Sequence, residues 1–155
     1  MICINRHTDY AVRILLALAK HHFGMRLSTS QIRDEMLIPP ALIQRIVADL
    51  ARGKFIDTFP GRDGGLQLAR PSAQINLKQV VEYFEGPISI SDYLTDDLDC
   101  PFEAQCPVRI SWGGLQTIIT NELEKISVQR LALEAKQIEV SSAKSGALSS
   151  IKSVE

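Results

Sequence analysis

The sequence has neither a long apolar run nor a leader segment. Its longest uninterrupted apolar run covers residues 14–19, far short of the roughly 20 apolar residues that cross a bilayer as a helix. No basic stretch followed by an apolar stretch opens the chain, as it would in a secretory signal. We therefore expect a cytoplasmic protein with no membrane partner.

Cysteine is also scarce. The chain has 3 cysteines, Cys3, Cys100 and Cys106, which are too few for the disulfide framework of a secreted domain. Cys100 and Cys106 lie close together in an acidic segment, and thiolate pairs on irregular backbone hold iron–sulfur clusters and soft metals. From the residues alone, two ordinary thiols are the simplest interpretation, and a reversible disulfide is another.

Motifs of catalysis are missing as well. The sequence contains no Walker loop and no recognisable set of nucleophile, base and orienting group. The glycines at positions 61, 64 and 65 lack the strand-then-helix setting of a dinucleotide-binding loop. These absences predict that the protein is not an enzyme.

What the chain does have is an uneven distribution of charge. Residues 1–70 carry ten basic and six acidic side chains, whereas residues 71–155 carry seven basic and twelve acidic ones. A basic front half suits a polyanionic partner such as nucleic acid, and the acidic half is then expected to face away from it.

Two helical segments are expected in the front half, over residues 8–22 and 28–36. Apolar residues recur at helical spacing in the first segment. Ser28 and Gln31 fit a capping box, in which each residue satisfies a backbone amide at the start of the second segment.

A proline pair then separates these helices from a third helix over residues 41–52, because residues before a proline avoid the helical region. A glycine-rich turn at residues 61–65 lies within an extended stretch, residues 55–71, and predicts a β-hairpin. Helix, turn, helix and hairpin in this order are typical of a winged helix that binds DNA.

The exposed face of the 41–52 helix is the candidate for reading bases. Gln44 and Arg45 lie early on it, where glutamine pairs with adenine and arginine with guanine, or either contacts phosphate. Arg62 lies at the hairpin tip, and free amides at the starts of the second and third helices are expected to bind phosphate. The candidate DNA contacts are Thr29, Ala41, Gln44, Arg45, Arg52, Lys54 and Arg62. For any one of them alone, a solvated surface charge is the simpler interpretation.

The rear half is expected to contain a sensor and a dimerisation element. A helix is predicted over about residues 77–84, followed by an irregular, cysteine-bearing segment at 88–107. The longest periodic stretch then predicts a helix over 108–138, and a serine-rich tail from 139 is predicted to be disordered. The long helix has more apolar residues than one head needs, which favours a two-fold dimer that binds palindromic half-sites.

Several motifs together resemble the Rrf2 family of winged-helix transcriptional regulators, the family of IscR, NsrR and CymR. They are the stretch Thr8–Arg13, residues 32–50, the wing sequence 61–71, and Cys106 followed by Trp112. The resemblance covers roughly residues 1–135 and implies a mainly α fold with a small β-hairpin wing. It also implies a homodimer with crossed long helices.

The same resemblance implies a possible [2Fe-2S] cluster. Cys100 and Cys106 match the second and third family cysteines, whereas the first is missing near Leu94. Asp9 stands where some members supply an acidic ligand from the partner's first helix. A further ligand, His7 or Cys3, would complete such a site.

These observations together predict a sequence-specific DNA-binding regulator, a repressor, that responds to the state of an iron–sulfur cluster, to redox state or to nitric oxide. The predicted domains are a winged helix over 1–87, a sensor loop over 88–107, a dimerisation helix over 108–138 and the tail. The alternative is a cluster-free regulator controlled by a cysteine-pair redox switch, a small molecule or a protein partner. A winged helix that binds only proteins is a further alternative.

Overall fold

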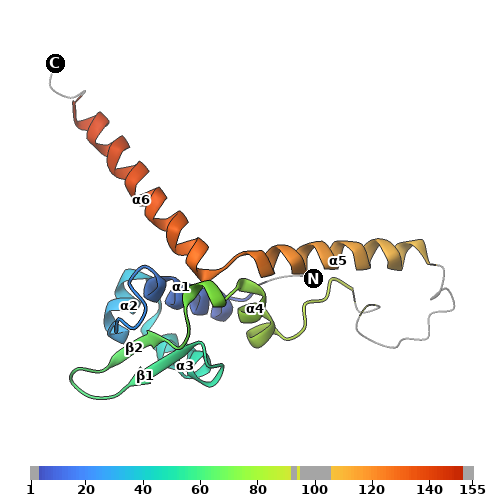
Figure 1. Ribbon diagram of the computed structural model, residues 1–155, viewed down its shortest axis with the longest axis horizontal. Coiled ribbons are helices and arrows are strands. Elements are labelled where there is room, and N and C mark those ends of the chain that lie inside the picture. Colours follow the sequence, from blue (N-terminus) through green and yellow to red (C-terminus); the bar gives the residue numbers. More distant parts are fainter. Residues whose placement is uncertain (1–3, 92–93, 95–105, 152–155) are drawn as a thin grey trace.

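A computed structural model describes residues 4–91, 94 and 106–151 and shows a helical head from which two long helices project (Figure 1). The elements are α1 (Arg6–Ala19), α2 (Thr29–Glu35), α3 (Pro40–Arg52), β1 (Ile56–Phe59), β2 (Gly65–Leu68), a 3-10 helix (Ser72–Gln74), α4 (Leu77–Glu85), α5 (Pro107–Lys125) and α6 (Val128–Ile151). The expected fold class, mainly α with a hairpin wing, is confirmed.

The helix starts in the head follow the capping signals of the sequence. Ser28 and Gln31 form the expected capping box at the start of α2, and Pro40 occupies the first position of α3. Asn5 caps α1, which therefore begins two residues before the predicted start, at Arg6. Local sequence thus sets the beginning of each helix of the helix–turn–helix.

One apolar core holds the head together. The largest fully buried side chains come from separate elements, and they include Ile14 of α1, Ile32 of α2, Ile46 of α3 and Val128 of α6. Each such side chain stabilises the fold by about 1.5–3 kcal/mol relative to leaving it exposed. The core therefore includes the first turn of α6 as well as the winged helix.

The wing is an antiparallel pair of short strands with a third segment beside it. Ile56 pairs with Leu68, and Phe59 pairs with Gly65 at the end near the turn. Leu27 exchanges two backbone hydrogen bonds with Leu66, of 3.0 and 2.8 Å. Gly65 has φ +143, and a Cβ there would lie 2.6 Å from the Leu27 carbonyl oxygen, so this close approach requires glycine.

The rear half differs from the sequence prediction in two respects. A single helix over 108–138 was expected, but the chain breaks at Ile126 and Ser127 into α5 and α6. The break is fixed because the Ile126 carbonyl accepts from the Leu77 amide at 2.9 Å and the Val128 amide donates to Ile75 at 2.8 Å. The Ser127 hydroxyl also caps α6 by accepting from the Arg130 amide.

The second correction concerns the tail, which was predicted to be disordered from residue 139. Helix α6 instead continues through Ile151. Serine is tolerated because its hydroxyl bonds back to the preceding turn, as Ser141 does to the Gln137 carbonyl at 2.8 Å. The expected sensor segment, residues 88–107, lies largely outside the described residues.

Helix α6 runs back across α1 before it leaves the head. Lys20, the C-cap residue of α1, donates to Glu35 of α2 at 2.9 Å and to Glu139 of α6 at 2.8 Å. The hydrogen bond with Glu139 and then that with Glu35 raise the pKa of Lys20 above its ordinary value. This ion-pair group joins three helices at one point.

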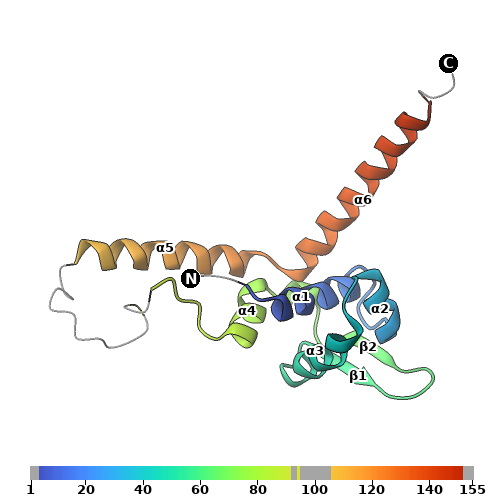
Figure 2. The same ribbon diagram turned by 180° about the vertical axis from the view of Figure 1, so that it is seen from behind.

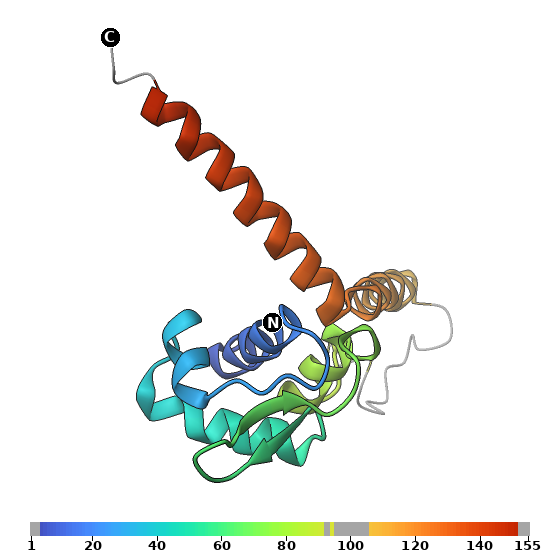
Figure 3. The same cartoon turned by 60° about the vertical axis from the view of Figure 1, so that its left-hand side comes forward.

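The recognition elements lie on the side of the head away from the projecting helices. Figures 1 and 3 show α3 and the hairpin on one side, with α5 and the free end of α6 on the other. No helix within the described ranges is long and apolar enough to cross a membrane.

Candidate nucleic-acid interface

Helix α3 divides into a buried face and an exposed face. Ile43, Ile46, Val47 and Leu50 are buried against the core. The opposite face, which is exposed, carries Ala41, Gln44, Arg45, Ala48 and Arg52. The packing thus fixes which side chains α3 presents, and these include the base-reading pair predicted from the sequence.

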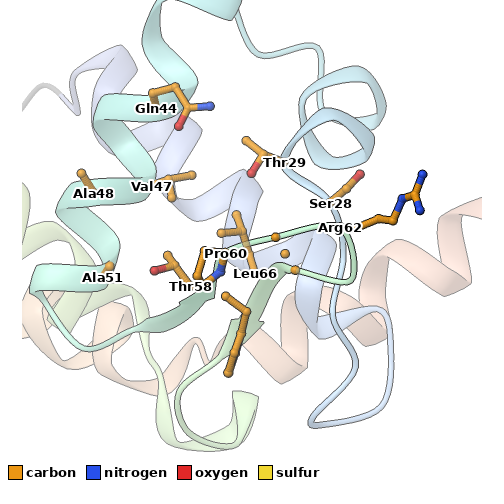
Figure 4. A pocket seen from close by; sticks show the side chains of 14 residues that line it. Ser28, Thr29, Gln44, Val47, Ala48, Ala51, Thr58, Pro60, Arg62 and Leu66 are labelled. Carbon is orange, nitrogen blue, oxygen red and sulfur yellow. The ribbon is translucent and has the colours of Figure 1, made fainter.

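A groove of about 650 Å³ separates α3 from the wing. Its lining includes Thr29, Gln44 and Ala48 on the helical side and Thr58 and Arg62 on the hairpin side. Figure 4 shows the side chains of Gln44 and Thr29 facing one another across part of it, with Arg62 projecting outward from the wing loop. The structure therefore brings three of the predicted contacts, Thr29, Gln44 and Arg62, to one concave surface. The other four do not line it: Ala41, Arg45, Arg52 and Lys54.

The cationic side chains predicted to contact DNA differ in their partners. Arg45, Lys54 and Arg62 are exposed, and none forms an ion pair with a carboxylate of the described residues. Arg52, by contrast, is paired with Asp49 three residues earlier. Unpaired cations contribute more to attraction of a polyanion than paired ones, because no neighbouring carboxylate offsets their potential.

The start of α3 offers fewer free amides than its sequence alone indicates. Pro39 and Pro40 have no N–H group, and the amides of Leu42 and Ile43 donate to the Pro39 carbonyl at 3.0 and 3.3 Å. The first turn of α3 therefore offers a single uncommitted amide, that of Ala41. This arrangement makes the start of α3 a poor anion site, since such sites use several amides together.

Arg26 lies beside the wing and is not among the residues predicted from the sequence to contact DNA. Its guanidinium lies over the ring of Phe59 at 3.6 Å from the centroid, and Phe59 ends β1 beside the wing turn. The bridge between Leu27 and Leu66 holds this segment against the hairpin. The sequence shows only that Arg26 comes directly before Leu27, the residue that pairs with the wing. The stacking of Arg26 on Phe59 becomes visible in the fold.

The candidate cluster ligands that the structure describes, His7, Asp9 and Cys106, do not form a common site. Asp9 accepts from Arg13 one turn along α1 at 2.9 Å, and His7 is hydrogen-bonded to Asp49 at 3.0 Å. Cys106 is a free, half-buried thiol that precedes α5, whereas Cys3 and Cys100 lie outside the described residues. The start of α5 is the end of that helix farthest from the head (Figure 2).

Metal binding has no ready site in the part of the chain that the structure describes. No three His, Cys, Asp or Glu side chains of these residues lie close enough together to hold an ion. Asp9 and Cys106 therefore belong to no preformed metal site among these described residues.

Comparison with known proteins identifies transcriptional regulators as relatives of this chain. Residues 4–134 match the family profile described as "Rrf2: Iron-dependent Transcriptional regulator". The HTH-type transcriptional regulator NsrR of Bacillus licheniformis is 24% identical over 136 residues, which cover 87% of this chain and 95% of that protein. Protein aau3 of Rhizobium meliloti is 30% identical over 105 residues, covering 66% of this chain and 67% of the relative.

A solved structure supports the same fold. CymR, the global cysteine regulator of B. subtilis, superposes with a TM-score of 0.70 at 21% sequence identity. The superposition covers 86% of this chain and 98% of CymR. At this identity the similarity shows that the two share their fold.

Proposed function

Since this chain belongs to the Rrf2 family of transcriptional regulators, we propose that it binds duplex DNA by placing α3 in the major groove and the wing along the flanking backbone. The observation that supports this most is the groove between α3 and the hairpin, which is lined by Gln44 and Arg62 and flanked by the exposed Arg45. A helix in the major groove with a basic hairpin beside it is a known docking geometry for DNA.

We further propose that two copies bind a palindromic operator through a dimer of α5 helices. Val108, Trp112, Leu115 and Ile118 of α5 are between 45% and 59% exposed. The side of α5 that faces its own chain is a different one, since Gln116 accepts from the Ile90 amide and Glu124 pairs with Lys78. An apolar stripe left open by its own chain is best covered by the same stripe of a second copy.

The signal to which the regulator responds is the subject of a separate proposal. A cluster held by Cys100 and Cys106, with Asp9 supplied by the second copy, is consistent with the distance of the α5 start from its own α1 (Figure 1). Anaerobic purification with iron and sulfide assays tests it, and an iron-free protein would favour the cysteine-pair switch, small molecule or protein partner.

The DNA-binding proposal is tested with duplexes selected from a random library by the purified full chain. We expect salt-dependent binding, and we expect Arg45→Ala combined with Arg62→Ala to lower the affinity about tenfold or more. Arg130→Ala is the matched control, because Arg130 is paired with Glu134 on α6 and should leave the affinity unchanged. If the chain retained no duplex at low salt in any redox state, the proposal would fail.

A further inference from the structure

The start of α3 is an exposed apolar surface inside the proposed DNA interface. Pro39, Pro40 and Ala41 are all exposed, and none has a side chain that donates or accepts a hydrogen bond. One turn further on, the same exposed face carries Gln44 and Arg45. The interface therefore combines an apolar leading end with a polar second turn.

We propose that Ala41, which follows Pro40 at the start of α3, reads the 5-methyl group of a thymine in each operator half-site. This inference rests on the proposed function, because it requires α3 to lie in the major groove. Thymine is the base that presents an apolar group there, and small apolar side chains such as alanine contact that methyl. Burial of a methyl against a methyl needs no hydrogen-bond partner, which matches the chemistry of Ala41.

Phosphate is a poorer occupant for the same surface. The first turn of α3 lacks the amides of residues 39 and 40, and those of Leu42 and Ile43 are already bonded to the Pro39 carbonyl. A phosphate would find only the Ala41 amide, and would place its charge against proline rings. Ala41 shares its helix face with Gln44 and Ala48, and both of these residues line the groove, so Ala41 belongs to the face that is proposed to meet the bases.

The position of Gln44 relative to Ala41 predicts which base lies next to the thymine in the half-site. Residues three apart on a helix are neighbours on one face, so both side chains reach adjacent base pairs. Glutamine pairs with adenine through two hydrogen bonds. Each half-site is therefore expected to place a thymine, read by its methyl, next to an adenine read by Gln44.

The experiment replaces each thymine of a selected duplex, one at a time, by deoxyuridine, which lacks only the 5-methyl group. We expect one symmetric position to weaken binding about fourfold per half-site and the other replacements to have little effect. Equal affinity for every thymine and uracil duplex would overturn the inference while leaving DNA binding intact.

A double-mutant cycle assigns the methyl contact to its residue. Ala41→Gly removes the protein methyl, so this variant should bind the thymine and uracil duplexes equally well. Ala73→Gly, at an exposed alanine of the 3-10 helix, should keep the wild-type preference. If Ala41→Gly kept the full preference for thymine while remaining folded by circular dichroism, the contact would belong to another residue and the assignment would be wrong.

Discussion

Helices α3 and α5 both carry apolar residues at helical spacing, but only α3 buries them within its own chain. Helix α3 has four buried residues, whereas no residue of α5 is buried. In α5, Trp112 is 45% and Ile118 is 59% exposed. The same sequence pattern thus completes a core in one helix and leaves a surface in the other, so periodicity alone does not say whose core a helix joins.

The difference also separates two kinds of function. Beyond its apolar first turn, the exposed face of α3 carries the polar Gln44 and the cationic Arg45, and it suits a hydrated, charged partner. The exposed stripe of α5 is apolar: Val108, Trp112, Leu115 and Ile118 recur at steps of four, three and three residues, so they share one face of the helix. Apolar exposure of this length is typical of an interface.

The largest effect on operator affinity is expected for a charged substitution in the apolar stripe of α5. Leu115→Glu places a charge in the apolar stripe, where burial against a second copy would cost several kcal/mol. We expect the dimer to dissociate, as measured by light scattering, and the operator affinity to fall about a hundredfold because two linked heads bind far better than one.

The matched control for this variant is Asn121→Glu, which adds the same charge at an exposed position of α5 outside the stripe. It should leave both the oligomeric state and the operator affinity unchanged. A monomeric wild-type protein would contradict the α5 interface directly. If both variants dissociated, the added charge would disrupt the dimer from either face of α5, and the apolar stripe would not be the interface.

A smaller effect on DNA affinity is expected for Arg26, which lies beside the wing. Arg26→Ala removes a cation held over Phe59, and we expect a severalfold loss of affinity that is the same for every duplex. The slope of log affinity against log salt should fall by about one per protomer, as for loss of a phosphate contact. Fluorescence anisotropy at several salt concentrations measures both quantities.

Two further variants distinguish contact from packing at this position. Phe59→Leu leaves the Arg26 charge but removes the ring that orients it, so it should weaken binding less than Arg26→Ala. Arg130→Ala, on α6, should not change the salt slope. A slope unaffected by Arg26→Ala would place this guanidinium outside the DNA interface.

Most of the head could be predicted from the sequence because its signals are local. The capping box at Ser28, the prolines before Ala41 and the glycines of the wing turn each act on neighbouring residues. The break at Ser127 was missed because it depends on hydrogen bonds to Ile75 and Leu77, some fifty residues away in the chain. Local patterns do not contain such pairings.

In the candidate site, too, the residues placed by local structure could be predicted from the sequence, and those placed by long-range contacts could not. Gln44, Arg45 and Arg62 were identified because a helix face and a turn tip place them without tertiary information. Arg26 was not, since its role depends on a ring brought to it by the hairpin. The pairing of Arg52 with Asp49 is local, three residues apart on one helix, and was available from the sequence.

The smallest expected effect concerns Leu37, an exposed apolar residue that belongs to neither surface. It lies in the turn between α2 and α3, is 81% exposed and has φ 51, a region that L side chains other than asparagine and aspartate seldom adopt. Leu37→Gly should raise the free energy of unfolding by roughly 0.5–1 kcal/mol, because glycine adopts this conformation without strain.

Urea unfolding at one protomer concentration measures this change, since the stability of a dimer depends on concentration. Leu37→Ala is the matched control: it removes the same apolar side chain but keeps the strained backbone, so it should not stabilise. Neither variant should alter the oligomeric state or the operator affinity. A loss of affinity in both would show that single exposed apolar residues of the head also serve the interface, and the contrast between α3 and α5 would then be one of degree.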